Sequence, residues 1–296
     1  MLSKSFTLLL FSFILFNGHA YAQFLSFPDS AEVFLPGIVS TKNSEVKIAF
    51  NRAGTKALWG GIDWIEGKKD FDIWESDKIN GEWTKPVRAS FDSDSTDFDP
   101  FFSPDDKTVY FFSNRVGGFG GDDIYQVSYN AQTGKFGEPV NAGPAVNSKG
   151  DEWAPVTDPA QEYLYFSTDG RKGYGKHDLF KIKLNDKDAQ PINLGNKINS
   201  ADDDFDAVVL PDGTLVFTST RADHDKAELF YFNAAYSHEV FTFPTLQVNS
   251  KDSWTLGPSI SFSDPGYLYF SSHLAKNMGR TDIYRIKYVL KNTGGN

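Results

Sequence analysis

The sequence predicts an all-β protein that folds as a five-bladed β-propeller. A motif of an acidic, an aliphatic and an aromatic residue recurs five times, at intervals of 50 to 55 residues. An apolar run rich in aromatic residues precedes most copies, and a turn signal such as Pro211-Asp212-Gly213 precedes each run. Repeats of this length, built from short strands and tight turns, are typical of propeller blades. The five copies are Asp72-Ile73-Trp74, Asp123-Ile124-Tyr125, Asp178-Leu179-Phe180, Glu228-Leu229-Phe230 and Asp282-Ile283-Tyr284.

Each repeat contains four expected strands, which are clearest in the third repeat. They are expected near Trp153 to Thr157, at Tyr163 to Thr168, at Asp178 to Leu184, and near Pro191 to Gly195. The second strand is apolar almost throughout, which indicates burial on both faces of the sheet. No segment keeps a 3.6-residue apolar period, so we expect little helix.

The two ends of the array predict how the ring closes. The last repeat has three strands and no fourth before the chain ends. We expect the segment near Phe34 to Ser40 to complete that blade, because an unpaired edge strand would otherwise stay open. A six-bladed ring is the alternative, but residues 23–44 are too few for four strands. The predicted boundaries are a signal peptide at 1–22, a lead at 23–31, the propeller at 32–290 and a tail at 291–296.

The first residues have the features of a secretory signal peptide. Lys4 is followed by the apolar run Phe6 to Phe16, and Ala20-Tyr21-Ala22 forms a cleavage site. A membrane anchor is the alternative, but a spanning helix needs about 20 apolar residues. The chain has no Cys, which rules out a lipid-modified N-terminus. We therefore expect cleavage after Ala22 and a periplasmic or secreted protein without a membrane span.

The second repeat carries a family resemblance. Phe102-Ser103-Pro104-Asp105-Asp106, Tyr110 to Arg115, Gly117-Gly118 and Asp123-Ile124-Tyr125 resemble the WD40-like propeller repeat of TolB and tricorn-type proteins. The resemblance extends to all five repeats and is weakest in the first and fourth. It implies the propeller fold and carries no catalytic residue over to this chain.

Composition and charge limit the function. The net charge of −10 disfavours nucleic acid as a partner, because phosphate binding needs clustered basic residues. The absence of Cys excludes thiol catalysis and thiolate zinc sites. No catalytic motif occurs, so we expect a non-enzymatic scaffold in the cell envelope that binds a protein or a neutral or cationic ligand. A five-bladed carbohydrate-active enzyme or glycan-binding propeller is the alternative, with Asp99 as one carboxylate but no evident second one.

Two sets of acids are candidate site residues. The first set opens the recurring motif, and its place in every repeat predicts a structural role in the blades. Its members are Asp72, Asp123, Asp178, Glu228 and Asp282. Arg115, Arg171 and Arg221 are expected to pair with these acids.

The second set stands at the start of the innermost strand of each blade. Equivalent positions surround one axis, so these side chains are expected to meet at one mouth of the channel. Capping of turns is the alternative role for them. We expect no cofactor, with Ca²⁺ at this mouth as the alternative, although neither of the acidic stretches Asp92 to Asp99 and Asp202 to Asp206 has EF-hand spacing. In the fifth repeat Trp254 stands where the other repeats have an acid. Its side chain is expected to be either an exposed stacking surface or a buried core residue. The set comprises Glu45, Asp97, Asp99, Glu152, Asp204, Asp206 and Trp254.

Overall fold

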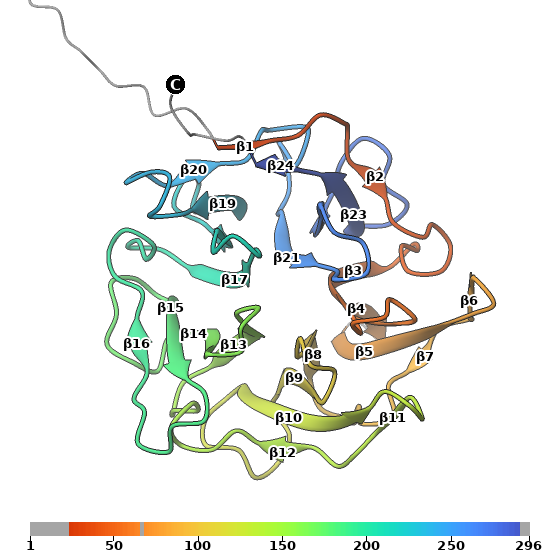
Figure 1. Cartoon of the computed structure of the whole chain (residues 1–296), viewed down its shortest axis with the longest axis horizontal. Coiled ribbons are helices and arrows are strands. Elements are labelled where there is room, and N and C mark those ends of the chain that lie inside the picture. Colours follow the sequence, from red (N-terminus) through yellow and green to blue (C-terminus); the bar gives the residue numbers. More distant parts are fainter. Residues whose placement is uncertain (1–23, 66–67, 291–296) are drawn as a thin grey trace, which may run out of the picture.

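The chain forms a ring of five β-sheets around a central axis (Figure 1). The computed structural model describes residues 24–65 and 68–290, and within these ranges it contains strands and no helix. None of the described residues therefore forms a helix that is long and apolar enough to span a membrane. The predicted five-bladed propeller is confirmed. The predicted signal peptide and C-terminal tail lie outside the described residues.

Each blade is an antiparallel sheet whose strands run in order from the axis to the rim. The innermost strands are β3 (Ser44–Phe50), β8 (Asp97–Phe102), β13 (Glu152–Thr157), β17 (Asp204–Val209) and β21 (Leu256–Ile260). The second strands are β4 (Lys56–Ile65), β9 (Thr108–Ser113), β14 (Tyr163–Thr168), β18 (Leu215–Ser219) and β22 (Tyr267–Ser272). The third strands are β5 (Lys68–Ile79), β10 (Asp123–Asn130), β15 (Asp178–Lys183), β19 (Glu228–Phe232) and β23 (Asp282–Lys287). The outer strands are β7 (Val87–Arg88), β12 (Val140–Asn141), β16 (Ile192–Asn193), β20 (Phe241–Thr242) and β2 (Glu32–Val33). Two short strands, β6 (Glu82–Trp83) and β11 (Lys135–Phe136), pair antiparallel with the last residues of β5 and β10.

The N-terminal segment closes the fifth blade, as predicted. Strand β2 pairs with β23, and the backbone N–H of Phe34 continues the ladder to the carbonyl of Ile283 at 2.7 Å. The closing strand begins two residues before the expected segment. In the expected lead, β1 (Leu25–Ser26) pairs with β24 (Val289–Leu290), so the two ends of the described chain lie side by side (Figure 1). This pairing protects two edges that would otherwise be exposed.

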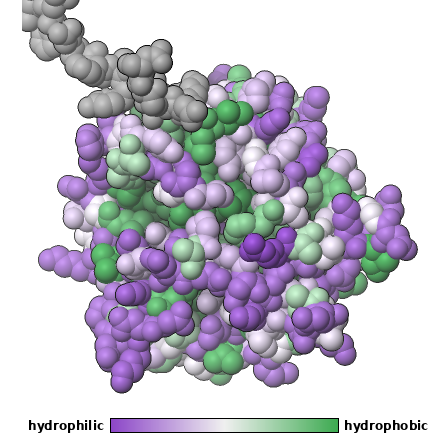
Figure 2. Space-filling model, in the orientation of Figure 1, coloured by the Kyte–Doolittle hydropathy of each residue, from purple (hydrophilic) through white to green (hydrophobic). Residues whose placement is uncertain are grey.

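The core lies between adjacent blades and is built mainly from the second strands. Phe111, Phe166, Phe217 and Phe270 occupy equivalent positions and are fully or almost fully buried. Their strands are buried on both faces because each blade packs against two neighbours. Figure 2 shows one face of the ring, where hydrophilic side chains cover most of the rim with apolar patches between them.

Candidate active site

All five innermost strands contain a β-bulge at the same place, near the mouth of the channel. In each of them the pairing register with the second strand shifts. One residue per bulge has a left-handed backbone, with φ between 46° and 63°. Bulges re-aim side chains and are common beside active sites. These residues are Lys47, Asp99, Ala154, Asp206 and Gly257.

Three of the bulges are joined by Asp206. Its Oδ1 lies 3.5 Å from the Nζ of Lys47, and its Oδ2 accepts a hydrogen bond of 2.9 Å from the N–H of Gly257. Lys47 and Asp206 are both buried. A Cβ added at Gly257 would lie 3.0 Å from the backbone N of Lys47, which is tighter than most real contacts. The small residue therefore lets the strands approach closely enough for the ion pair to form.

Asp99 is a buried carboxyl group in a different electrostatic situation. Its Oδ1 has no hydrogen-bond partner among the described residues. Burial raises the pKa of Asp99 well above its usual range, and the negative charge of Asp206 raises it further, whereas Lys47 acts in the opposite direction. Two neighbouring acids with different surroundings can hold different protonation states at one pH, which acid–base chemistry requires.

A cavity of about 320 Å³ opens at this mouth. Asp99, Asp122 and Asp206 supply its carboxylates. Its aromatic lining consists of Phe71, Phe98, Phe112, Trp153 and Phe205. Several of these rings contact one another, including Phe71 and Phe98 at a centroid distance of 5.1 Å. At the opposite end of the inner strands, side chains leave a cavity of only about 20 Å³, so the larger space is a bowl at one face.

Asp122 completes the group and was missed by sequence reasoning. Its carboxylate accepts a hydrogen bond of 2.8 Å from the indole N–H of Trp153. Burial raises the pKa of Asp122, and this hydrogen bond partly offsets the effect. The sequence did contain an indication that Asp122 differs from the blade pattern. Asp122 directly precedes the recurring acid, at a position where the other repeats have Phe71, His177, Ala227 and Thr281.

The structure divides the predicted acidic mouth into two groups. Asp99 and Asp206 line the cavity. The other four acids stand at the first or second residue of their inner strands and face the loops that precede these strands. Each accepts hydrogen bonds from the backbone N–H and the hydroxyl group of the residue four positions earlier. They are Glu45, Asp97, Glu152 and Asp204, and these contacts fit the alternative role of turn capping.

The arginines differ from the expectation. Arg115 pairs with Asp97 at 2.5 Å and Arg221 with Asp204 at 2.6 Å, and neither pairs with a recurring motif acid. Arg171 donates to the carbonyl groups of Ala145 and Val146. The expectation failed because the loop before the inner strand lies closer to these side chains than the motif acids do.

Three of the five recurring motif acids accept hydrogen bonds from N–H groups of the loop before them. Asp123 accepts hydrogen bonds from the N–H groups of Phe119 and Gly120, and Asp178 accepts the same pair from Tyr174 and Gly175. Asp282 repeats the arrangement with Met278 and Gly279. The remaining two have cationic partners: Asp72 pairs with Arg88, and Glu228 lies 3.5 Å from the Nζ of Lys226.

Trp254 lies beside the cavity and is not a core residue. It is 43% exposed, and its indole N–H donates to the carbonyl of Asp225. Its ring centroid lies 6.5 Å from that of Phe205, which lines the cavity. The burial interpretation of Trp254 is therefore wrong. Its exposed ring is a surface next to the bowl.

The chain matches no protein-family model and no curated protein. Among solved structures it is similar to an endo-arabinase from Bacteroides thetaiotaomicron VPI-5482, with 13% identity and a TM-score of 0.54 over 86% of this chain and 98% of that one. It is also similar to a thermostable family-43 glycoside hydrolase, with 12% identity and a TM-score of 0.53 over 88% and 96% of the two chains. The tricorn protease is matched over 21% of its length, at 15% identity and a TM-score of 0.47. At these identities the likeness to the first two structures establishes the fold alone.

The expectation of a non-enzymatic scaffold is contradicted by these findings. The endo-arabinase and the family-43 glycoside hydrolase, which share nearly the whole ring, are both carbohydrate-active enzymes. In the sequence no second carboxylate stood out as a partner for Asp99, and this favoured a non-enzymatic protein. Asp122 and Asp206 line the same cavity as Asp99, so that argument no longer holds.

Proposed function

We propose that this protein is a glycoside hydrolase whose active site is the bowl at the channel mouth. The observation that carries the proposal is the meeting of Asp99, Asp122 and Asp206 in one cavity lined by aromatic rings. Flat aromatic faces suit the apolar faces of sugar rings. A pair of carboxyl groups in different protonation states supplies the acid and the base that glycosidic cleavage requires.

Each carboxyl group has a distinct role in the proposed reaction. Asp99 is the general acid, because its raised pKa keeps it protonated at pH values where an exposed Asp is ionised. It donates its proton to the glycosidic oxygen as the bond between that oxygen and the anomeric carbon breaks. The Asp122 carboxylate accepts a proton from a water molecule, and the oxygen of that water forms the new bond to the anomeric carbon. Asp206 is a positioning residue, tied to Lys47 and Gly257, whose charge raises the pKa of Asp99.

Hydrolysis assays on purified protein test this proposal. Arabinan-type and other oligosaccharides are incubated with the protein, and new reducing ends are measured. Asp99→Asn and Asp122→Asn are each expected to lower the rate at least 100-fold. Asp202→Asn is the matched control, because Asp202 belongs to the same acidic stretch as Asp206 but does not line the cavity. Binding without new reducing ends, or equal rates in all variants, would overturn the hydrolase.

We also infer that the blades are WD40-like repeats of the TolB and tricorn type and that the protein is exported. The recurring motif and the five-bladed ring support the first inference. The charged start, apolar run and Ala-Tyr-Ala site support the second. Mass spectrometry of the protein recovered from the periplasm or medium tests export, with Gln23 as the expected first residue. An intact Met1 would contradict cleavage.

A further inference from the structure

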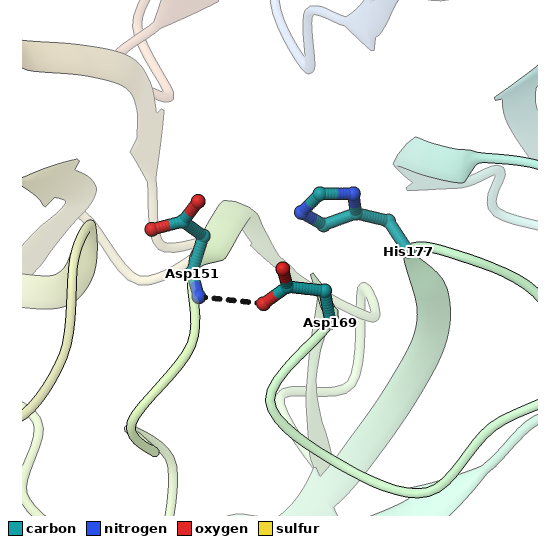
Figure 3. A group of neighbouring side chains, drawn as sticks. All are labelled: Asp151, Asp169 and His177. Carbon is teal, nitrogen blue, oxygen red and sulfur yellow. Dashed lines mark hydrogen bonds between the residues drawn. The ribbon is translucent and has the colours of Figure 1, made fainter.

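Three side chains outside the bowl form a compact group in the loops of the third blade. Asp151 precedes β13, Asp169 follows β14, and His177 precedes β15. Each offers one possible metal-ligating atom, and these atoms all lie within 4.8 Å of one another. Figure 3 shows the imidazole ring with one nitrogen turned toward the two carboxylates.

His177 is the residue that distinguishes this group from a cluster of acids. The residue is only 9% exposed, and its buried Nε2 has no hydrogen-bond partner among the described residues. Its Nδ1 lies 3.1 Å from Oδ1 of Asp203. A histidine that binds a metal through one nitrogen almost always hydrogen-bonds a carboxylate, carbonyl or water through the other. The ring thus has the second-sphere partner of a ligand and a free nitrogen that faces two carboxylates.

The repeats show that the propeller does not need a histidine here. The position of His177 is occupied by Phe71, Asp122, Ala227 and Thr281 in the other blades. In four of the five repeats the backbone carbonyl of this residue accepts a hydrogen bond from the neighbouring blade. The carbonyls of Asp122 and His177, for example, accept from the N–H groups of Glu152 and Asp204. That contact is made by the backbone. The imidazole is therefore not explained by the architecture of the blade.

The two carboxylates are held in place by the surrounding backbone. The N–H of Asp122 donates to Oδ1 of Asp151 at 2.9 Å, and the N–H of Asp151 donates to Oδ1 of Asp169 at 2.8 Å. A Cβ at Gly121 would lie 2.0 Å from Oδ1 of Asp151, and one at Gly150 would lie 2.2 Å from Oδ1 of Asp169. Any larger residue at either glycine would displace a carboxylate. The group is thus oriented before any ligand arrives.

We propose that Asp151, Asp169 and His177 bind a divalent transition-metal ion, with Zn²⁺ as the representative. Imidazole nitrogen and carboxylate oxygen are both ligand types of Zn²⁺, and three protein ligands leave a fourth tetrahedral position for a water molecule. A hard ion such as Ca²⁺ would favour six to eight oxygen ligands, and an imidazole does not suit it. Metal–ligand bonds of about 2.1 Å would draw the three atoms together slightly, through side-chain rotation.

The bound ion would stabilise one wall of the bowl. The Trp153 ring stacks on the His177 ring at a centroid distance of 3.9 Å and an interplanar angle of 16°. Trp153 lines the cavity, and its indole N–H donates to Asp122. Fixing His177 therefore fixes Trp153 and, through it, Asp122. The binding of the ion does not depend on the proposed hydrolysis.

Isothermal titration of the EDTA-treated chain with ZnCl₂ tests the site. Wild type is expected to bind one ion, and Asp169→Asn and His177→Gln are each expected to weaken binding at least tenfold. Asp169 is exposed, so its substitution leaves the fold intact, and circular dichroism verifies this for both variants. His224→Gln is the matched control, because exposed His224 contacts Asp202 at 2.7 Å without belonging to the group. It is expected to bind Zn²⁺ as wild type does.

Three outcomes would overturn the proposal. They are no Zn²⁺ binding by wild type, equal affinity in wild type and His177→Gln, and tighter binding of Ca²⁺ than of Zn²⁺ in a parallel titration. The first would make His177 a partner of Asp203 alone. The second would place the ion elsewhere on the acidic surface.

Discussion

The ammonium group of Lys47 lies 3.5 Å from the carboxylate of Asp206, although 159 residues separate them in the sequence. They stand on the bulges of β3 and β17, two inner strands that are separated in the ring by β21. Gly257 of β21 donates its N–H to the other oxygen of the same carboxylate. One side chain thus connects three blades at the point where the channel opens.

Lys47→Met is expected to destabilise the protein by about 3 kcal/mol, because it leaves the buried Asp206 carboxylate without its cation. Urea unfolding at neutral pH measures the loss. The double variant Lys47→Met/Asp206→Asn removes both charges and is expected to regain most of it. If the single and double variants were equally stable, the unpaired Asp206 carboxylate would not be the cause of the lost stability.

Asp99→Asn is expected to stabilise the protein by about 1 kcal/mol at neutral pH while hydrolysis is lost. It removes a buried carboxyl group that ionises in the unfolded chain and whose Oδ1 has no hydrogen-bond partner among the described residues, and Asn tolerates the left-handed backbone at this position. Asp97→Asn, two residues earlier, serves as the contrast. It removes the partner of Arg115 and is expected to cost about 3 kcal/mol. Thermal unfolding of both variants should show shifts of opposite sign.

The raised pKa of Asp99 makes a prediction for pH. Above about pH 4 the unfolded chain ionises this carboxyl group, while the folded protein keeps its proton. The folded state then binds more protons than the unfolded state, so this group lowers stability as pH rises, until pH passes its raised pKa. The stability difference between Asp99→Asn and wild type should therefore be small near pH 3.5 and grow toward neutral pH. A difference that does not vary with pH would contradict the raised pKa.

Gly257→Ala is expected to destabilise the protein by about 1–2 kcal/mol. The new methyl group would press on the backbone of Lys47, and Ala is strained at the φ of 63°. Ala154→Gly, at the equivalent bulge of β13, should have the opposite sign, because Ala154 already carries that strain at a φ of 53°. Chemical denaturation of the pair measures both effects. If Gly257→Ala stabilised the protein, the bulge would change its backbone conformation to accommodate the methyl group, and the expected strain would be absent.

Phe24→Ala is expected to cost about 3 kcal/mol and lower the melting temperature. Phe24 is fully buried, and its ring lies 5.0 Å from Tyr236 and 5.1 Å from Tyr231. This residue therefore anchors the N-terminal segment on the fourth blade. Phe119→Ala is the control, because that ring is 49% exposed, and it should change stability by less than about 0.5 kcal/mol. Equal effects would show that the segment does not contribute to closure.

The features that repeat along the chain were readable from the sequence. The spacing of the motif from Asp72 to Asp282 predicted five blades, and the apolar second strands predicted burial on both faces. The missing fourth strand predicted closure by the N-terminal segment, although β2 begins two residues earlier than expected. These features depend on local turns, strand periodicity and the count of strands, which are properties of short segments of sequence.

The site depended on contacts that only the folded ring creates. The sequence placed six acids at one mouth, but four of them are tied to the loops before their strands by hydrogen bonds from residues four positions earlier. These four are Glu45, Asp97, Glu152 and Asp204. The bulges set Asp99 and Asp206 apart from them, because a left-handed residue changes the direction of its side chain and leaves no mark in the apolar pattern. Asp122 and the group of Asp151, Asp169 and His177 are assembled from separate loops. The sequence by itself therefore determined the blades and their closure. The tertiary structure decided which polar side chains meet, because their proximity arises from the packing of neighbouring blades around the axis.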